Sequence, residues 1–143
     1  MRNVHYVLAL SAVVYLASLT CPQAFCVSGN CTAWPGYGAL LFGWLTVGQC
    51  WANSTWLANP LLLLAWILIV LGRRIPAAVS AVAALAVSAS FLAADKVIVN
   101  DGGFELMMTG VRLAYWLWLV SMAIALVAAL LCAKQPDRSS AEA

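Results

Sequence analysis

Charged side chains are scarce in this sequence. Only 8% of its 143 residues are charged, against about 25% in an average soluble protein, and 65% are hydrophobic. A soluble domain of this length needs a polar surface over its core, whereas a bundle that faces lipid can be apolar on its outside as well. The composition therefore predicts an integral membrane protein that forms one compact domain.

Basic residues are too few for a nucleic-acid-binding surface. The formal net charge is +2, and the longest basic run is the pair Arg73-Arg74. The sequence also lacks a nucleophile with a base, a carboxylate pair, a phosphate-binding loop and a metal cluster of the kind that catalytic sites use. It thus predicts no nucleic-acid partner, catalytic residue, metal or cofactor, and it favours a non-enzymatic role over an enzymatic one.

Four apolar stretches are each long enough to cross the hydrocarbon layer, which takes about 17–25 helical residues. They cover residues 4–20, 54–72, 75–94 and 110–133. The predicted fold class is therefore all-α, a four-transmembrane-helix bundle that forms a single domain over residues 1–133. The tail, 134–143, is expected to be disordered and cytoplasmic.

The sequence leads to further expectations for the first and the second of these helices. The first has the outline of a cleaved signal peptide, but Leu19 stands where a small residue is required, so we expect a retained helix. In the second, Asn53 is expected to cap the free amides at the helix start. A kink is expected near Asn59-Pro60.

The basic residues predict the orientation. With four crossings, most of them fall on one side, which by the positive-inside rule is the cytoplasmic side. These residues are Arg2, Arg73, Arg74, Lys134 and Arg138. Counting the glycine-broken segment 36–50 as a fifth span would scatter the arginines across both sides. That segment is therefore expected to be an interfacial or re-entrant helix in the first outer loop, and both termini are expected in the cytoplasm.

The second outer loop suggests a small hairpin. Two β-prone runs, 97–99 and 104–107, flank Asp101-Gly102. Because an isolated hairpin is marginal in water, it would need support from the first outer loop. An irregular loop is the alternative, which the sequence leaves open.

Four of the five cysteines fall in the first outer loop. They are Cys21, Cys26, Cys31 and Cys50. In a bacterium this loop faces an oxidising space, so disulfides are permitted, and four thiols allow three complete pairings. One interpretation is structural staples; the other is thiol–disulfide chemistry, because some quinone-linked oxidoreductases are also four-helix membrane proteins with outward-facing cysteines. The lack of a C-x-x-C motif favours staples.

Arg112 is the one charge predicted inside an apolar helix, where it should face protein or water rather than lipid. Asp95 is predicted at the same depth, so we expect an Asp95–Arg112 ion pair across the third and fourth helices, with Glu105 as the competing acid. Snorkelling of Arg112 to the headgroups and a role in transport are the alternatives.

The third helix is rich in small residues at four-residue spacing, which permits close helix contact. These are Ala77, Ser80, Ala81, Ala84, Ser88, Ala89 and Ala93. The pattern predicts packing inside the bundle or, alternatively, a contact with another membrane protein or a second copy.

Three segments resemble stretches of small uncharacterised bacterial inner-membrane proteins. They read GYGALLFG at 36–43, WLANP at 56–60 and YWLWLVSM at 115–122. The resemblance implies a bacterial membrane origin and no particular activity. The favoured role is thus structural, accessory or interaction-related, with a membrane thiol–disulfide oxidoreductase as the first alternative and a small transporter component as the second.

Overall fold

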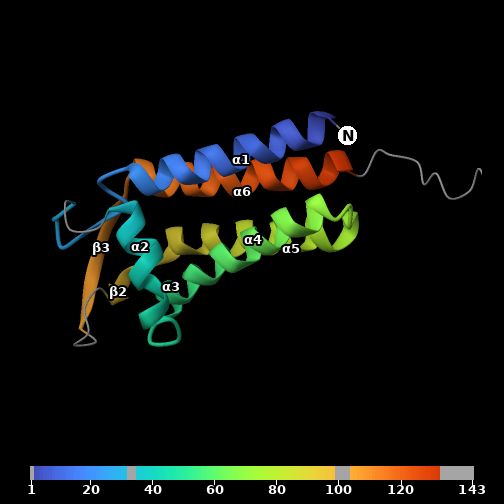
Figure 1. Ribbon diagram of the computed structural model, residues 1–143. Coiled ribbons are helices and arrows are strands. Elements are labelled where there is room, and N and C mark those ends of the chain that lie inside the picture. Colours follow the sequence, from blue (N-terminus) through green and yellow to red (C-terminus); the bar gives the residue numbers. More distant parts are fainter. Residues whose placement is uncertain (1, 32–34, 99–103, 133–143) are drawn as a thin grey trace, which may run out of the picture.

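The computed structural model describes residues 2–31, 35–98 and 104–132 of the chain. The protein is mostly helical, and four of its helices are long and apolar enough to span a membrane. These helices lie side by side, and short helices and a small sheet form a cap at one end of them (Figure 1). We refer to the two parts as the bundle and the cap.

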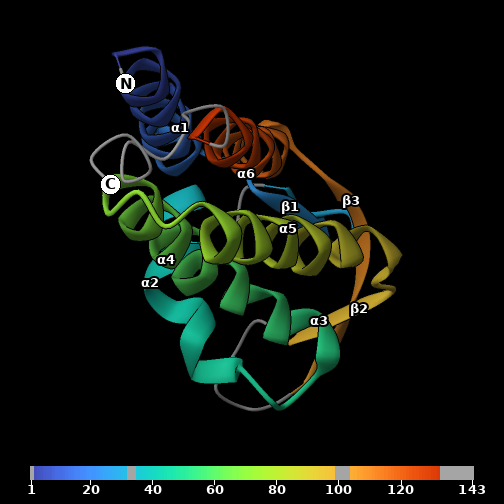
Figure 2. The same cartoon turned by 90° about the vertical axis from the view of Figure 1, so that its right-hand side faces the viewer.

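The bundle consists of two helix pairs. Its helices are α1 (Arg2–Thr20), α4 (Ala58–Val70), α5 (Arg74–Ser90) and α6 (Leu113–Cys132). The short helices α3 (Trp51–Ser54) and η2 (Thr55–Leu57) extend α4 into the cap, and η3 (Phe91–Ala93) extends α5. Helices α1 and α6 lie together on one side and α4 and α5 on the other, and α5 also packs on α6 (Figure 2).

Most fully buried side chains of the bundle are small, with Leu62 and Met122 as large exceptions, and many other large apolar side chains face outward. Ala81 and Ala84 of α5 and Ala125 of α6 are fully buried, whereas Val79 is 64% and Ile67 is 56% exposed. No more than 33% of any of the four apolar windows is buried inside the protein. This arrangement suits helices whose outer surface meets lipid and whose backbones approach closely through alanine.

The small residues of α5 are used mostly within the chain. Those buried in the bundle are Ala77, Ser80, Ala81, Ala84 and Ser88. The hydroxyl of Ser80 donates a hydrogen bond of 2.7 Å to the carbonyl oxygen of Leu61 on α4. Internal packing therefore accounts for this face of α5.

Helix α1 is joined to the rest of the bundle by polar contacts as well as packing. The hydroxyl of Ser11 donates to the carbonyl oxygen of Ser121 on α6 at 2.7 Å and accepts from the indole N–H of Trp66 on α4 at 3.0 Å. These contacts link α1 to both α6 and α4.

The end of the bundle opposite the cap carries basic residues. The start of α1, the turn with Arg73 and Arg74 between α4 and α5, and the end of α6 all lie there (Figure 1). Lys134, Arg138 and the tail that we expect to be disordered lie outside the described residues. The described part of the expected cytoplasmic cluster is thus gathered at one end.

The cap contains a three-stranded antiparallel sheet of order β1-β3-β2. Its strands are β1 (Phe25–Val27), β2 (Lys96–Ile98) and β3 (Glu105–Val111). The hairpin predicted in the second outer loop is confirmed, with Val97 opposite Leu106, while its turn lies outside the described residues. Strand β1 supplies the support from the first outer loop, so the all-α fold class is corrected to a mostly helical fold with a small sheet.

The fourth predicted helix, 110–133, starts too early. Gly110 and Val111 belong to β3, where they lie opposite Cys26 and Phe25 of β1, and α6 begins only at Leu113. Pairing with a strand from the first outer loop overrides the apolar character of this stretch. Arg112 consequently stands at the junction of sheet and helix, not inside a transmembrane helix.

The segment 36–50 lies across the end of the bundle rather than along it (Figure 1). It forms α2 (Gly36–Phe42) and the 3-10 turn η1 (Gly43–Thr46). Gly36 is buried, and a Cβ at this position would collide with the carbonyl oxygen of Ser18 in α1. A glycine here lets α2 rest directly on the backbone of α1.

Candidate functional site

The cap holds the two features with chemical potential, a cysteine pair with an arginine and an apolar cavity. Cys26 and Cys31 form a disulfide, with their Cα atoms 4.1 Å apart. Between them Val27 and Asn30 exchange backbone hydrogen bonds of 2.9 and 2.8 Å across a tight turn, which brings the two cysteines together. Cys26 is only 2% exposed, whereas Cys31 is half-buried.

The other predicted cysteines are not joined to this pair. Cys21, at the end of α1, and Cys50, just before α3, are free and half-buried. The thiol of Cys50 makes a long contact of 3.8 Å with the carbonyl oxygen of Lys96. Among the described cysteines the structure thus forms one disulfide, and Cys132 in α6 is also free.

Arg112 contacts the sulfur atoms of the disulfide. Its Nε lies 3.0 Å from Sγ of Cys26, and its Nη2 lies 3.2 Å from Sγ of Cys31. The backbone N–H of Arg112 also donates to the carbonyl oxygen of Ala24 at 2.9 Å, which holds the arginine beside β1. A guanidinium in this position favours the anionic form of whichever sulfur is released when the disulfide opens.

The structure does not bring together the ion pair predicted for Arg112. Asp95 is exposed and forms no ion pair, and Glu105 is bound to Lys96 at 3.0 Å, the one ion pair in the described part of the chain. Both partners of that pair are more than half exposed, so its contribution to stability is small. Arg112 contacts the sulfur atoms because the pairing of β3 with β1 places it next to β1 instead of next to α5.

Asn53 has a different role from the helix cap that we predicted. The position before α3 is Cys50, and no side-chain cap bond is formed there. The Asn53 side chain instead pairs with the backbone of β2: its Nδ2 donates to the carbonyl oxygen of Ile98 at 2.7 Å, and its Oδ1 accepts from the Ile98 N–H at 3.1 Å. The side chain therefore occupies the free edge of the sheet as a neighbouring strand would.

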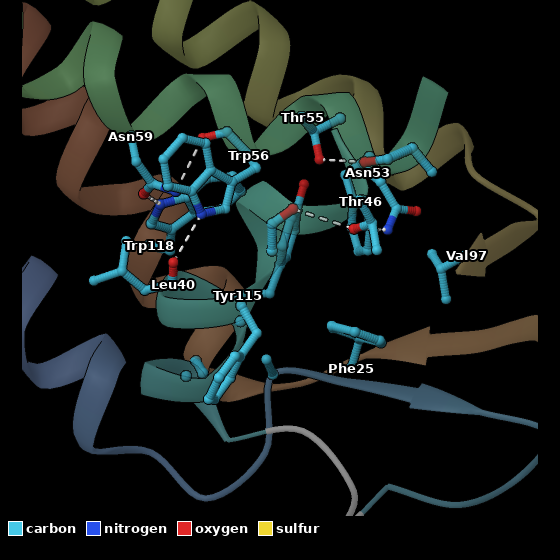
Figure 3. A pocket seen from close by; sticks show the side chains of 18 of the residues that line it. Phe25, Leu40, Thr46, Asn53, Thr55, Trp56, Asn59, Val97, Tyr115 and Trp118 are labelled. Atoms are coloured by element: carbon cyan, nitrogen blue, oxygen red, sulfur yellow. Dashed lines mark hydrogen bonds between the residues drawn. The ribbon is translucent and has the colours of Figure 1, made fainter. Parts of the chain in front are cut away.

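A cavity of about 240 Å³ lies between the cap and the adjacent end of the bundle. Its wall is built by the end of α1, by α2 and η1, by α3 to α4, by the sheet, and by the start of α6. None of the described residues that line it is charged. In Figure 3 the indoles of Trp56 and Trp118 stand beside Asn59 at one end, and Phe25 and Val97 lie toward the other.

The polar side chains on the cavity wall are already occupied. The amide oxygen of Asn59 accepts from the indole N–H of Trp118 at 2.8 Å and from the hydroxyl of Tyr15 at 3.2 Å. The indole N–H of Trp56 donates to the carbonyl oxygen of Leu40 at 2.9 Å (Figure 3). Every buried side-chain nitrogen and oxygen in the described ranges has a partner. The surface that the cavity presents is therefore mainly apolar.

Metal ligands and similar proteins give no further indication of the function. No group of three histidine, cysteine or acidic residues able to hold a metal occurs among residues 2–31, 35–98 and 104–132. Comparison with protein families, curated proteins and solved structures finds no match. The geometry of the site is therefore the basis for its interpretation.

The sequence does not predict two of the contacts in the cap. The approach of Arg112 to Cys26 spans 86 residues, and that of Asn53 to Ile98 spans 45. No local spacing encodes either of them. The one available signal was the predicted hairpin, because a third strand from the first outer loop would have brought Cys26 near the end of β3.

Proposed function

We propose that this chain is a non-enzymatic, multi-pass protein of the bacterial inner membrane that displays the cap on the outer face as an accessory or interaction module. The number of long apolar helices, the gathering of Arg73 and Arg74 at the end opposite the cap, and the resemblance of three segments to inner-membrane proteins support this location. Both termini are then cytoplasmic, and the lipid bilayer is the principal partner.

The use of polar groups in the cap is the observation that carries the proposed role. Asn53 forms hydrogen bonds with the backbone of β2, and Trp56 links η2 to α2 through a hydrogen bond. The described buried polar side chains all have partners inside the protein. These groups hold a rigid surface in place. Exposed on that surface are large side chains such as Trp51 at 54% and Phe104 at 70%, which suit recognition of another membrane or outer-face protein.

In-cell photocrosslinking tests this role. A photoreactive amino acid at Gln49 or Trp51, both exposed on the cap, is expected to give a discrete protein adduct. The same residue at Val79, which faces outward from the bundle, is the matched control and is expected to give lipid adducts only. Equal adduct patterns at the cap and control positions would contradict an interaction role for the cap.

A second candidate function, thiol–disulfide exchange, is favoured by the contact of Arg112 with both sulfurs. A partner thiolate would attack Sγ of Cys31, the more accessible sulfur, and release Cys26 as a thiolate beside the guanidinium. The second partner thiol would then resolve the mixed disulfide. The partner dithiol is thereby oxidised to a disulfide and the Cys26–Cys31 pair is reduced to two thiols.

Alkylation of the reduced protein separates exchange from a structural staple. If the pair is redox-active, the reduced wild type should react rapidly with iodoacetamide at neutral pH, Arg112→Lys should keep much of this reactivity, and Arg112→Gln should lose it. Equal alkylation rates in wild type and Arg112→Gln, together with an absence of mixed disulfides in cells, would show that the disulfide has a structural role only.

A further inference from the structure

We infer that the cavity between cap and bundle binds one acyl chain of a membrane phospholipid, whose headgroup stays outside. The inference rests on the proposed membrane location and adds a ligand to it. The cavity belongs to neither the crosslinking surface nor the cysteine pair, since Cys26, Cys31 and Arg112 do not line it.

The chemistry of the wall selects a hydrocarbon. The described part of the wall carries no charge, and most of its surface is apolar, so a charged ligand group would lose its hydration there without gaining an ion pair. Aromatic rings form much of the surface, with the rings of Phe25, Phe91 and Tyr115 packed in sequence at centroid distances of 5.7 and 5.6 Å. Such a surface gains most from an apolar chain.

The volume is sufficient for a chain segment. A dry apolar cavity of about 150 Å³ is large enough to bind benzene. The cavity of this protein has about 240 Å³ and is not fully enclosed. It can therefore hold the end of an acyl chain while the remainder of the lipid stays outside.

The position of the opening selects a membrane lipid as the source of the chain. Among the described lining residues only Phe42, at 55%, and Leu45, at 47%, are exposed, so we place the mouth beside the end of α2 and η1. Next to them Leu41 is 58% and Trp44 is 56% exposed, which gives the mouth an apolar and aromatic rim. At the outer end of the transmembrane helices, such a rim lies where acyl chains meet headgroups.

Photolabelling in vesicles tests this inference. The full-length protein is reconstituted in phosphatidylethanolamine and phosphatidylglycerol vesicles that contain a trace of phosphatidylglycerol with a diazirine near the end of one acyl chain. Labelled residues are identified by mass spectrometry. We expect labelling of the cavity residues Leu40 and Trp56 as well as of Val79 and Ile67, which face outward from the bundle.

Two cavity variants and one control define the expected change. Ala39→Phe fills the cavity, and Leu45→Trp narrows its mouth without touching the buried wall. The control, Ala86→Phe, adds the same ring at an exposed position of α5. Labelling at Trp56, normalised to Val79, is expected to fall by roughly tenfold or more in both cavity variants, which corresponds to a loss of about 1.4 kcal/mol or more of binding free energy. It should stay unchanged in the control.

The outcomes that contradict the inference are distinct from those that contradict the membrane location. Unchanged labelling at Trp56 in both Ala39→Phe and Leu45→Trp would overturn the cavity site. Labelling of Trp56 by a free diazirine fatty acid, but not by the phospholipid probe, would overturn the phospholipid assignment. If Val79 and Ile67 also remained unlabelled, the proposed insertion into the membrane would fail first.

Discussion

Most of the fully buried side chains of the bundle are alanine or serine, with Leu62 and Met122 as the large exceptions, whereas aromatic rings gather where the bundle meets the cap. Ala81 and Ala125 are fully buried in the bundle, while Phe91 of η3 and Tyr115, near the start of α6, form the centre of the cluster between bundle and cap. The difference follows from the solvent expected around each part. In lipid, burying a large side chain gains little, so small residues that allow close contact are favoured; next to water, burying aromatic area is a main stabilising term.

Polar groups are also used differently in the two parts. In the bundle, hydroxyls such as that of Ser11 bind carbonyl oxygens that are already part of a helix. In the cap, Asn53 satisfies a backbone N–H and C=O of β2 that have no other partner on that side. Loss of a polar contact should therefore cost more in the cap than in the bundle.

The largest expected effect is that of Asn53→Ala. The substitution leaves the N–H and C=O of Ile98, a residue only 7% exposed, without their side-chain partner. Unpaired buried polar groups cost about 1–3 kcal/mol each, so the free energy of unfolding should fall by about 4 kcal/mol. Unfolding in detergent measures it, and Gln49→Ala, an exposed cap change, is the control. A decrease in the free energy of unfolding of less than about 1 kcal/mol would show that Asn53 does not stabilise β2 in this way.

Gly36→Ala tests the joint between the two parts. The added Cβ meets the backbone of Ser18, which cannot rotate away as a side chain would, so α2 must move off α1. The expected loss is about 3 kcal/mol, the upper part of the range for overpacking. Gly48→Ala is the comparison, since nothing lies within 4 Å of its Cβ and its φ of +87° makes the cost conformational only. Equal melting temperatures for wild type and Gly36→Ala would disprove close contact at this joint.

Removal of the disulfide should have a smaller effect. In the chain-entropy account, closing so short a loop contributes about 2 kcal/mol, which the Cys26→Ser, Cys31→Ser double variant should lose. Reduction of the wild type should lower the melting temperature equally, and Cys132→Ala, at the other end of α6, should not change it. A reduced wild type as stable as the oxidised form would show that the pair does not staple the cap.

The smallest effect is expected in the bundle, from Ser11→Ala. The hydroxyl takes part in two hydrogen bonds, with Ser121 and Trp66. Hydrogen bonds between transmembrane helices contribute about 0.6 kcal/mol on average, so a loss of roughly 1 kcal/mol is expected in the same unfolding assay. A loss as large as that of Asn53→Ala would remove the proposed difference between bundle and cap.

The parts of the fold that were predictable depend on local patterns. Length and hydropathy locate the long helices, and the Asp101-Gly102 pair between two β-prone runs locates the hairpin. The end of β3 was missed because Gly110 and Val111 are as apolar as the helix that follows. Only their pairing with β1, more than 80 residues earlier, makes them a strand.

The candidate site was less predictable for the same reason. Choosing Cys26–Cys31 among the six possible pairs of the four cysteines requires knowledge of the turn between them, and the contact of Arg112 requires the sheet. The expected partners Asp95 and Glu105 were inferred from depth in the membrane, which assumed that Arg112 lay inside a helix. The cavity is formed by segments from most of the chain, so no local pattern could indicate it.

The most direct test of the membrane arrangement is thiol accessibility in intact spheroplasts. In a background with Cys21, Cys50 and Cys132 changed to alanine, the Cys26–Cys31 disulfide leaves no free thiol, and one cysteine is introduced at Gln49 in the cap or at Arg74 between α4 and α5. A membrane-impermeant maleimide is expected to label Gln49→Cys at once and Arg74→Cys only after permeabilisation. Labelling of Arg74→Cys in intact spheroplasts would contradict the account.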